Sequence, residues 1–319
     1  MKMILADIKK PAAAVIAAAV IMCGCDSLTQ TVTETTAPTS ESLRVSGELL
    51  ISDDSDTVSD YPVTVNDVVI SGSPQRVICL SSSLTEIIYE LGYGGRLIGR
   101  GSYCDYPESA AALKDFGKPA SPDLDAIRAA SPELVITATS IPSKDVTALS
   151  DIGISVLYIQ SPRSVEEFGR IYTALGMVFG GLFDGEKAGG EVFGGIKTAL
   201  QSCDASLGRF VYVTEGGAVA GGDTFEGSVL SLYGENIAAG ASGYSFDKSL
   251  LADDQPDSVV LSSDVPLSEL TSDSIFGGLD AVNSGRIFTV SNSFFESPSG
   301  RITEITKELS ADEGAEDEA

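Results

Sequence analysis

The chain has 319 residues, of which 43% are hydrophobic and 21% charged, so it can bury a sizeable core as one large domain or two lobes of ordinary size. Twenty Lys and Arg against 46 Asp and Glu give a formal net charge of −26, which argues against nucleic acid as a partner because phosphates need a basic surface. The absence of His excludes Ser-His-Asp and Cys-His catalytic groups and His-ligated zinc or haem iron.

Residues 1–25 have the pattern of a targeting segment. A basic start precedes an apolar run from Ala12 to Met22, which is shorter than the roughly 20 residues that a membrane span needs. The run ends in Gly24-Cys25, and a small residue before Cys at this place resembles the bacterial lipoprotein box. We expect Cys25 to carry lipid and to anchor an exported protein on the outer face of the cytoplasmic membrane. An uncleaved anchor and a signal peptide without lipid are the alternatives.

The segments at the two ends of the folded body are polar. Residues 26–60 are rich in Ser, Thr and Asp and contain few large apolar residues, so we expect a flexible tether. Residues 63–70 have the composition of a strand and stand near the start of the body. Residues 308–319 form an acidic tail, which we expect to be disordered.

Short apolar runs alternate with helical patterns from residue 61 to residue 163. The runs that we predict as strands are 76–80, 96–99, 134–137 and 156–159, and the predicted helices are 84–91, 124–130 and 145–151. Ser83 and Glu86 form a capping box, which predicts that the first helix begins there. Because strands that alternate with helices indicate a parallel sheet flanked by helices, residues 61–163 are predicted to form a first α/β lobe.

A linking helical segment is predicted over residues 164–204. Ser164 and Glu167 form a second capping box at its start. The helical stretch 184–202 contains four internal glycines at 189, 190, 194 and 195. Each costs about 1 kcal/mol relative to Ala in a helix interior, so tertiary packing must offset them.

A second α/β pattern covers residues 205–307. A buried strand is predicted at 210–214. Residues 248–261 then repeat the order found at 125–136, which is a helix, an acidic turn with Pro and a buried strand. This repetition indicates two similar lobes.

Several stretches carry a family resemblance, among them the following four. Arg-Val-Ile-Cys-Leu-Ser-Ser-Ser-Leu-Thr-Glu begins at residue 76, Tyr-Cys-Asp-Tyr-Pro spans 103–107, Gly-Gly-Asp-Thr-Phe spans 221–225, and Pro-Ser-Gly-Arg spans 298–301. Together they resemble the substrate-binding proteins of ABC importers for cobalamin, haem and iron-siderophores, and the stretch 103–107 is most similar to the cobalamin branch. The resemblance covers about 61–310. It implies two Rossmann-like α/β lobes with mainly parallel sheets, joined by a single long helix, with the ligand in a cleft between the lobes.

The candidate binding surface consists of the loops that follow the predicted strands, because ligands of open α/β sheets bind beyond the carboxyl ends of the strands. In the first lobe, Ser82 and Ser83 can hydrogen-bond a polar ligand edge or simply cap the helix. Tyr103 and Tyr106 offer flat apolar faces with polar tips, which suit a corrin or porphyrin ring, unless they belong to a packed surface loop. Asp105, between them, is expected mainly to order the loop.

The second lobe offers loop glycines, which let a bulky ligand approach the backbone, and aromatic side chains that can form a cleft wall. An ordinary turn cluster and core packing are the alternatives. The candidates are Glu215, Gly222, Asp223, Thr224, Phe225, Tyr244, Phe246, Phe294 and Phe295.

The resemblance also implies docking to a membrane permease through one acidic residue on each lobe. Asp125 stands at the first-lobe position, with a solvated helix residue as the alternative. At the second-lobe position the chain has Ser249, and Asp247 lies two residues earlier. The chain departs here from the pattern of the family.

These observations predict a non-catalytic, membrane-tethered binding protein that captures a corrinoid and passes it to an ABC permease and its ATPase. We expect a monomer without a resident cofactor or metal. The alternatives are a haem or iron-siderophore binder of the same family and a surface scavenger without a permease. An exported enzyme acting on corrinoids is a further alternative, but no nucleophile with a nearby base is visible.

Overall fold

The computed structural model describes residues 43–47, 50–51 and 58–313. The predicted signal peptide, residues 1–25 with Cys25, lies outside the described residues, as does most of the predicted tether. Among the residues described, no helix combines the length and the hydrophobicity that a membrane crossing requires.

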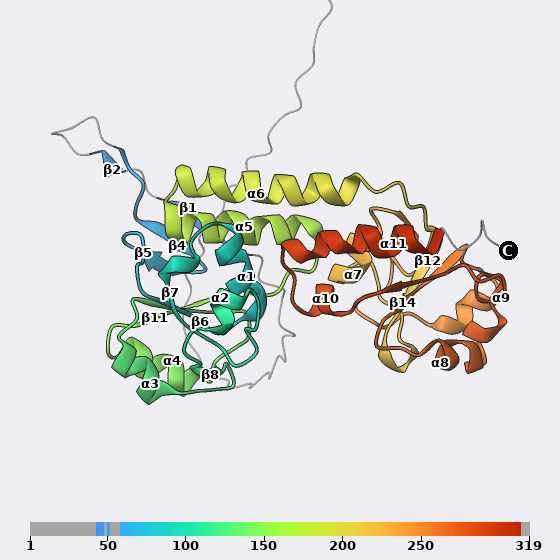
Figure 1. Cartoon of the computed structure of the whole chain (residues 1–319), viewed down its shortest axis with the longest axis horizontal. Coiled ribbons are helices and arrows are strands. Elements are labelled where there is room, and N and C mark those ends of the chain that lie inside the picture. Colours follow the sequence, from blue (N-terminus) through green and yellow to red (C-terminus); the bar gives the residue numbers. More distant parts are fainter. Residues whose placement is uncertain (1–42, 48–49, 52–57, 314–319) are drawn as a thin grey trace, which may run out of the picture. The chain divides into compact units, whose positions relative to one another are not determined.

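Two four-stranded parallel sheets organise the chain (Figure 1). The first contains β6 (Val77–Cys79), β7 (Leu97–Arg100), β10 (Leu134–Thr137) and β11 (Ser155–Tyr158), in the order β11-β10-β6-β7. The second contains β12 (Gly208–Val213), β13 (Gly234–Asn236), β14 (Ser258–Ser262) and β15 (Ile287–Val290), in the order β13-β12-β14-β15. Strands β10 and β14 are buried along their whole length, as expected for inner strands covered on both faces. The predicted α/β class with parallel sheets is therefore confirmed, and we call the parts built on these sheets the first and the second lobe.

Helices connect the strands within each lobe. The first lobe has α1 (Ser82–Glu90), α2 (Glu108–Ala111), α3 (Leu124–Ala130) and α4 (Ser143–Ser150), with a short ribbon of β8 (Gly117–Lys118) and β9 (Ser121–Pro122). The second lobe has α7 (Phe225–Leu230), η3 (Lys248–Ala252), α8 (Leu267–Ser272), α9 (Asp280–Asn283), α10 (Ser293–Glu296), η5 (Gly300–Glu304) and α11 (Ile305–Glu313). This alternation follows from parallel pairing, which requires a crossover between successive strands.

The folded body begins earlier than the predicted boundary at residue 61. Strand β1 (Val45–Gly47) pairs antiparallel with β4 (Val63–Val65), so the predicted tether is wrong at its carboxyl end. The single strand predicted at 63–70 is a hairpin of β4 and β5 (Val68–Ile70). Its two-residue turn has positive φ at Asn66 and Asp67, the backbone of a type I′ turn.

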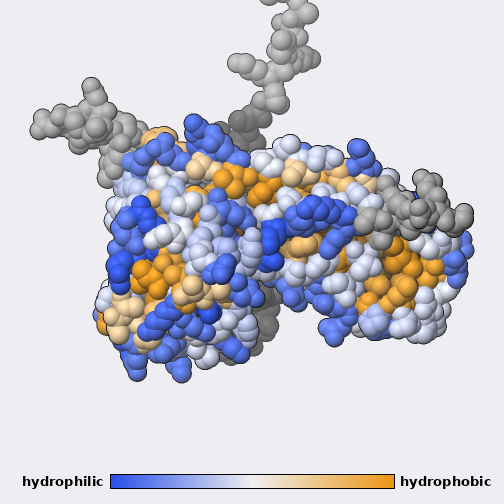
Figure 2. Space-filling model, viewed as in Figure 1, coloured by the Kyte–Doolittle hydropathy of each residue, from blue (hydrophilic) through white to orange (hydrophobic). Residues whose placement is uncertain are grey.

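Two helix boundaries also differ from the prediction. Helix α1 begins at Ser82, and its cap is Ser81, whose hydroxyl accepts the N–H of Leu84, rather than Ser83. At the other end of the body, α11 continues through Glu313 because Leu309 is buried in the core. The predicted disordered tail from residue 308 is therefore wrong at its start. Figure 2 shows hydrophilic side chains along the outer face of this helix.

The linking segment predicted at 164–204 contains two helices, and the second, longer one is the helix that leads into the second lobe. Helix α5 (Val165–Gly180) ends at Gly181, whose φ of +86° breaks the helix, and α6 (Asp184–Gln201) returns beside it (Figure 1). The predicted cap is confirmed, since the Ser164 hydroxyl accepts the N–H of Glu167. Helix α6 alone then leads into β12 of the second lobe.

Small residues allow α5 and α6 to pack closely. A Cβ at Gly189 would lie 2.5 Å from the carbonyl oxygen of Tyr172 and 2.7 Å from Cα of Thr173. Tertiary packing thus accounts for this glycine of α6. A Cβ at Gly190, Gly194 or Gly195 would meet open space, and nothing in the structure explains these three.

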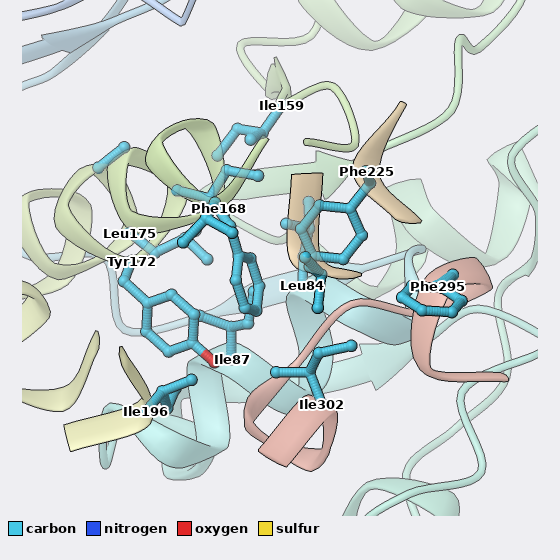
Figure 3. Close-up of a cluster of buried hydrophobic side chains, with 14 of the residues drawn as sticks. Leu84, Ile87, Ile159, Phe168, Tyr172, Leu175, Ile196, Phe225, Phe295 and Ile302 are labelled. Carbon is cyan, nitrogen blue, oxygen red and sulfur yellow. The ribbon is translucent and has the colours of Figure 1, made fainter. Parts of the chain in front are cut away.

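An apolar cluster joins the two lobes (Figure 3). Phe168 of α5 packs edge-on against Phe225 of α7, with ring centroids 5.4 Å apart, and Phe225 packs against Phe295 of α10 at 6.3 Å. Leu84 and Ile87 of α1 belong to the same cluster. Both lobes therefore bury side chains in one core.

Alanine substitutions at two adjacent positions test the packing of α5 against α6. We expect Gly189→Ala to destabilise the protein by about 1–3 kcal/mol, because its methyl group has no space beside Tyr172. Gly190→Ala should stabilise it by about 0.5–1 kcal/mol, because Ala loses less backbone entropy than Gly in a helix. Urea unfolding of both variants measures the difference, and equal effects of the two substitutions would contradict the packing.

Candidate functional site

The loops after β6 and β7 of the first lobe contact a segment of the second lobe. The hydroxyl oxygens of Ser82 and Ser297 lie 2.8 Å apart. Nearby, the guanidinium of Arg301 pairs with Glu86 and lies over the ring of Tyr106. We call these five residues the lobe junction. It places the carboxyl end of the first sheet against the chain that leaves the last strand of the second sheet, where the topology predicts a ligand.

The loop 101–107 presents two tyrosine rings. Its backbone is fixed at one end, because the N–H of Gly101 donates to the carbonyl of Cys79 and a Cβ at Gly101 would lie 2.5 Å from the carbonyl oxygen of Leu80. The Cys104 side chain is buried and anchors the middle of the loop. Tyr103 and Tyr106 are 62% and 48% exposed, so both rings offer surface to a ligand.

A cation lies over each of these rings. The Lys118 ammonium is 5.0 Å from the ring centroid of Tyr103, and the Arg301 guanidinium carbon is 4.9 Å from that of Tyr106. Asp105 is exposed between the two tyrosines. The loop therefore combines aromatic surface with positive charge in a chain whose net charge is strongly negative.

Two carboxylates of α1, the buried Glu86 and the half-buried Glu90, hold the second-lobe side of the junction. Glu86 is 2% exposed and accepts hydrogen bonds from Nε and Nη2 of Arg301, each at 2.7 Å, and from the Ser299 hydroxyl at 2.7 Å. One turn later, Glu90 accepts from the Gly300 N–H at 2.8 Å and from the Tyr172 hydroxyl. Burial raises the pKa of Glu90, which the hydrogen bonds from Tyr172 and Gly300 partly offset.

The two candidate serines differ in accessibility. Ser82 is half-buried and contacts Ser297 across the junction, so a ligand entering there would meet both hydroxyls. Ser83 is buried in the first turn of α1, and its hydroxyl lies 3.3 Å from that of Ser81. This corrects the expectation that Ser83 is available to a ligand, because its position inside the turn faces the protein.

Asp223 of the second lobe orders the local backbone. Its carboxylate accepts from the Gly243 N–H at 2.6 Å, the Ser242 hydroxyl at 2.8 Å and Nη2 of Arg163 at 2.7 Å. The Gly243 N–H, Ser242 and Arg163 together lower the pKa of Asp223. Because Arg163 comes from the loop after β11 of the first lobe, this ion pair is a second link between the lobes.

Three further second-lobe candidates have structural roles instead of the binding roles expected. A Cβ at Gly222 would lie 2.6 Å from the carbonyl oxygen of Ala239, so this glycine permits close approach of another chain segment rather than of a ligand. Thr224 is buried, and its hydroxyl caps α7 by accepting the N–H of Gly227. Phe225 is buried in the core that joins the lobes.

The other aromatic candidates divide into core and surface. Phe295 is buried beside Tyr212, which corrects the expectation of an exposed wall at this position. Phe294 and Phe246 are half-buried and pack against the hydrophobic core. Tyr244 is exposed, and its hydroxyl donates to Glu226 at 2.7 Å.

Glu215 and the two docking candidates lie on the surface. Glu215 is exposed in a short 3₁₀ turn, Glu215–Gly217, directly after β12. The Asp125 side chain is 95% exposed in the first turn of α3 and pairs with Arg128 at 2.9 Å. Asp247 caps η3 by accepting from the N–H and the hydroxyl of Ser249. It takes the capping place that Asp123 has in α3, so Ser249 stands where Asp125 stands in the first lobe.

The described part of the chain contains no cluster of acidic or sulfur ligands that could hold a metal ion. Cys79 and Cys104 are buried free thiols; burial raises the pKa of both, to about 12 for Cys79, so they are poor nucleophiles. Sequence reasoning assigns no role to Arg301, Lys118 or Arg163. Only Arg301 belongs to a stretch that carries the family resemblance, Pro-Ser-Gly-Arg at 298–301.

Comparison with known proteins identifies the family of this chain. A cobalamin-binding protein of Halobacterium salinarum is 23% identical over 272 residues, covering 79% of this chain and 74% of the relative. The ABC transporter substrate-binding lipoprotein YvrC of Bacillus subtilis is 24% identical over 270 residues, covering 78% and 84%. The crystal structure of a possible iron-binding periplasmic solute-binding protein from Staphylococcus epidermidis superposes with a TM-score of 0.64 at 24% identity, covering 75% of this chain and 98% of that one. The family model of the periplasmic binding proteins matches residues 77–293, and this chain belongs to that family.

Proposed function

We propose that the protein is the substrate-binding component of an ABC importer and that its ligand is cobalamin or a related corrinoid. The observation that carries this proposal is the loop 101–107, which exposes Tyr103 and Tyr106 at the carboxyl end of the first sheet beside the second lobe. The name of the Halobacterium relative supports the corrinoid, and that of the Bacillus relative supports the importer.

The chemistry of the tyrosine loop suits a large flat ring with a polar fringe. A tyrosine face packs against an apolar ring, while its hydroxyl reaches hydrogen-bonding groups at the edge. Lys118 adds donors beside the ring of Tyr103 for amide carbonyls or a phosphate. Because the chain has no His, no protein imidazole replaces an axial ligand on cobalt.

A haem or an iron-siderophore is the competing ligand. Exposed tyrosines can ligate iron, and the two cations beside them favour carboxylate groups on the ligand. The Staphylococcus protein, which shares the fold, is described as possibly iron-binding. Direct titration with the three classes of ligand decides between them, and recovery of unaltered ligand distinguishes binding from an enzymatic reaction.

The two tyrosines are expected to supply much of the first-lobe affinity. Stacking on a flat ligand contributes about 1 kcal/mol beyond the burial of area, and the lost contact area adds to it at about 25 cal/mol per Å². Tyr103→Ala and Tyr106→Ala should each weaken cobalamin binding about tenfold or more in an absorbance titration. Phe183→Ala, which truncates an exposed aromatic ring at the turn between α5 and α6, should leave affinity unchanged.

Two results would count against this proposal. Wild-type affinity in both folded tyrosine variants would show that the loop does not line the site. Tight binding of haem without any response to cobalamin or cobinamide would replace the corrinoid with the competing ligand.

We also propose that Asp125 docks the loaded protein on its permease. Its side chain is 95% exposed, whereas the Asp247 carboxylate accepts two hydrogen bonds from Ser249 at the cap of η3. Asp125→Ala should leave cobalamin affinity intact and lower uptake of labelled cobalamin several-fold in cells that carry the permease. Asp151→Ala, which removes another exposed acid of the first lobe, is the matched control. Normal uptake with the Asp125 variant would contradict docking through this helix. If cobalamin uptake does not depend on this protein at all, a scavenger without a permease is favoured.

The amino-terminal pattern supports attachment of the protein to the membrane by lipid on Cys25. The apolar run ends in Gly24-Cys25, and the Bacillus relative is named a lipoprotein. Mass spectrometry of the mature protein should find Cys25 as the first residue with acyl chains attached. An unmodified amino terminus at another residue would refute lipidation.

A further inference from the structure

The guanidinium of Arg301 uses different parts of its surface for two contacts. Nε and Nη2 form a fork on the two carboxylate oxygens of Glu86, each at 2.7 Å. The same group lies over the Tyr106 ring, with its central carbon 4.9 Å from the ring centroid. Because the fork fixes the position of the guanidinium, it also fixes where the cation lies beside the ring.

Glu86 provides a rigid base for this arrangement. Its side chain is buried in α1, and the Ser299 hydroxyl donates to the same oxygen that accepts Nε of Arg301. If Arg301 moved away, the buried Glu86 carboxylate would lose its cationic partner, which is strongly unfavourable. The arginine is therefore held firmly, although its own side chain is one third exposed.

Tyr103 offers a contrast on the same loop. Lys118 lies over its ring and interacts with the Tyr103 side chain, but its ammonium is exposed and the described residues give it no carboxylate partner. A point charge of this kind does not impose a plane on the ring. Of the two exposed tyrosines, only Tyr106 lies beside a cation of the other lobe that a buried carboxylate holds in place.

We propose that Arg301 is a positioning residue for Tyr106: held by Glu86, it sets the orientation of the ring that receives the ligand. A residue of the second lobe thereby determines the geometry of the first-lobe loop. The effect on affinity rests on the proposed function, whereas the effect on the ring itself does not.

A double-mutant cycle tests the coupling. Arg301→Lys keeps the positive charge beside Glu86 but removes the fork and the flat face. It should weaken cobalamin binding about three- to tenfold in the otherwise unchanged protein, and have no further effect in the Tyr106→Ala background. Arg209→Lys, which alters an arginine–carboxylate pair with Asp254 in the second lobe, is the matched control and should bind as the wild type does.

The orientation of the ring can be followed without any ligand. In protein with ¹³C-labelled tyrosine rings, Tyr106→Phe identifies the Tyr106 resonance, which should shift and broaden in Arg301→Lys and stay unchanged in Arg209→Lys. Glu86→Gln weakens the fork while residue 301 remains arginine, and it should change the same resonance. It serves as the second variant if circular dichroism shows that Arg301→Lys does not fold.

The outcomes separate the two proposals. An unchanged Tyr106 resonance, or an equal loss of affinity from Arg301→Lys with and without Tyr106, overturns the positioning role. Failure of the wild-type protein to bind cobalamin, haem or a siderophore overturns the proposed function, while the resonance still decides the role of Arg301.

Discussion

The apolar cluster around Phe168 is the interaction on which the arrangement of the two lobes depends. Phe168 stands on α5 and belongs to the same cluster as Leu84 of the first lobe and Phe225 of the second, and all three side chains are buried (Figure 3). Separation of the lobes would expose this cluster to water at about 25 cal/mol for every Å² of apolar surface. The cluster therefore favours a body in which binding loops of both lobes are already close, instead of one that assembles its site by a wide hinge motion.

Polar links at the edge of this cluster give the lobes a defined register. An apolar contact is non-directional, whereas the fork of Arg301 on Glu86 is satisfied in one geometry only. The pair between Arg163 and Asp223 is about 40% exposed on both sides and contributes less, because water screens it. The pair of Arg301 with the buried carboxylate of Glu86 is consequently the one that specifies how the segment 297–301 meets α1.

Much of the fold can be predicted because buried parallel strands are continuous apolar runs, as at 134–137 and 210–214. Strand β13 escapes prediction because its sequence, Gly-Glu-Asn, has no such run. The site is less accessible to prediction for a physical reason: an aromatic residue beyond a strand can face the core or solvent. The sequence around Phe225 and Tyr106 does not separate these outcomes, yet the first is core and the second surface. The partner of Glu86 lies 215 residues away, beyond any local pattern.

The loop 101–107 shows how core packing and the contacts between the lobes contribute to ligand binding. An exposed ring loses conformational freedom when a ligand immobilises it, and that loss reduces affinity. Here the loop is fixed before the ligand arrives, by the close contact of Gly101 with Leu80, by the buried Cys104 and, at Tyr106, by Arg301. Part of the conformational entropy of the loop is thus lost when the protein folds, and the burial of Glu86 and the core beneath it offset that loss. The same buried pair that sets the register of the lobes therefore prepares the aromatic surface for its ligand.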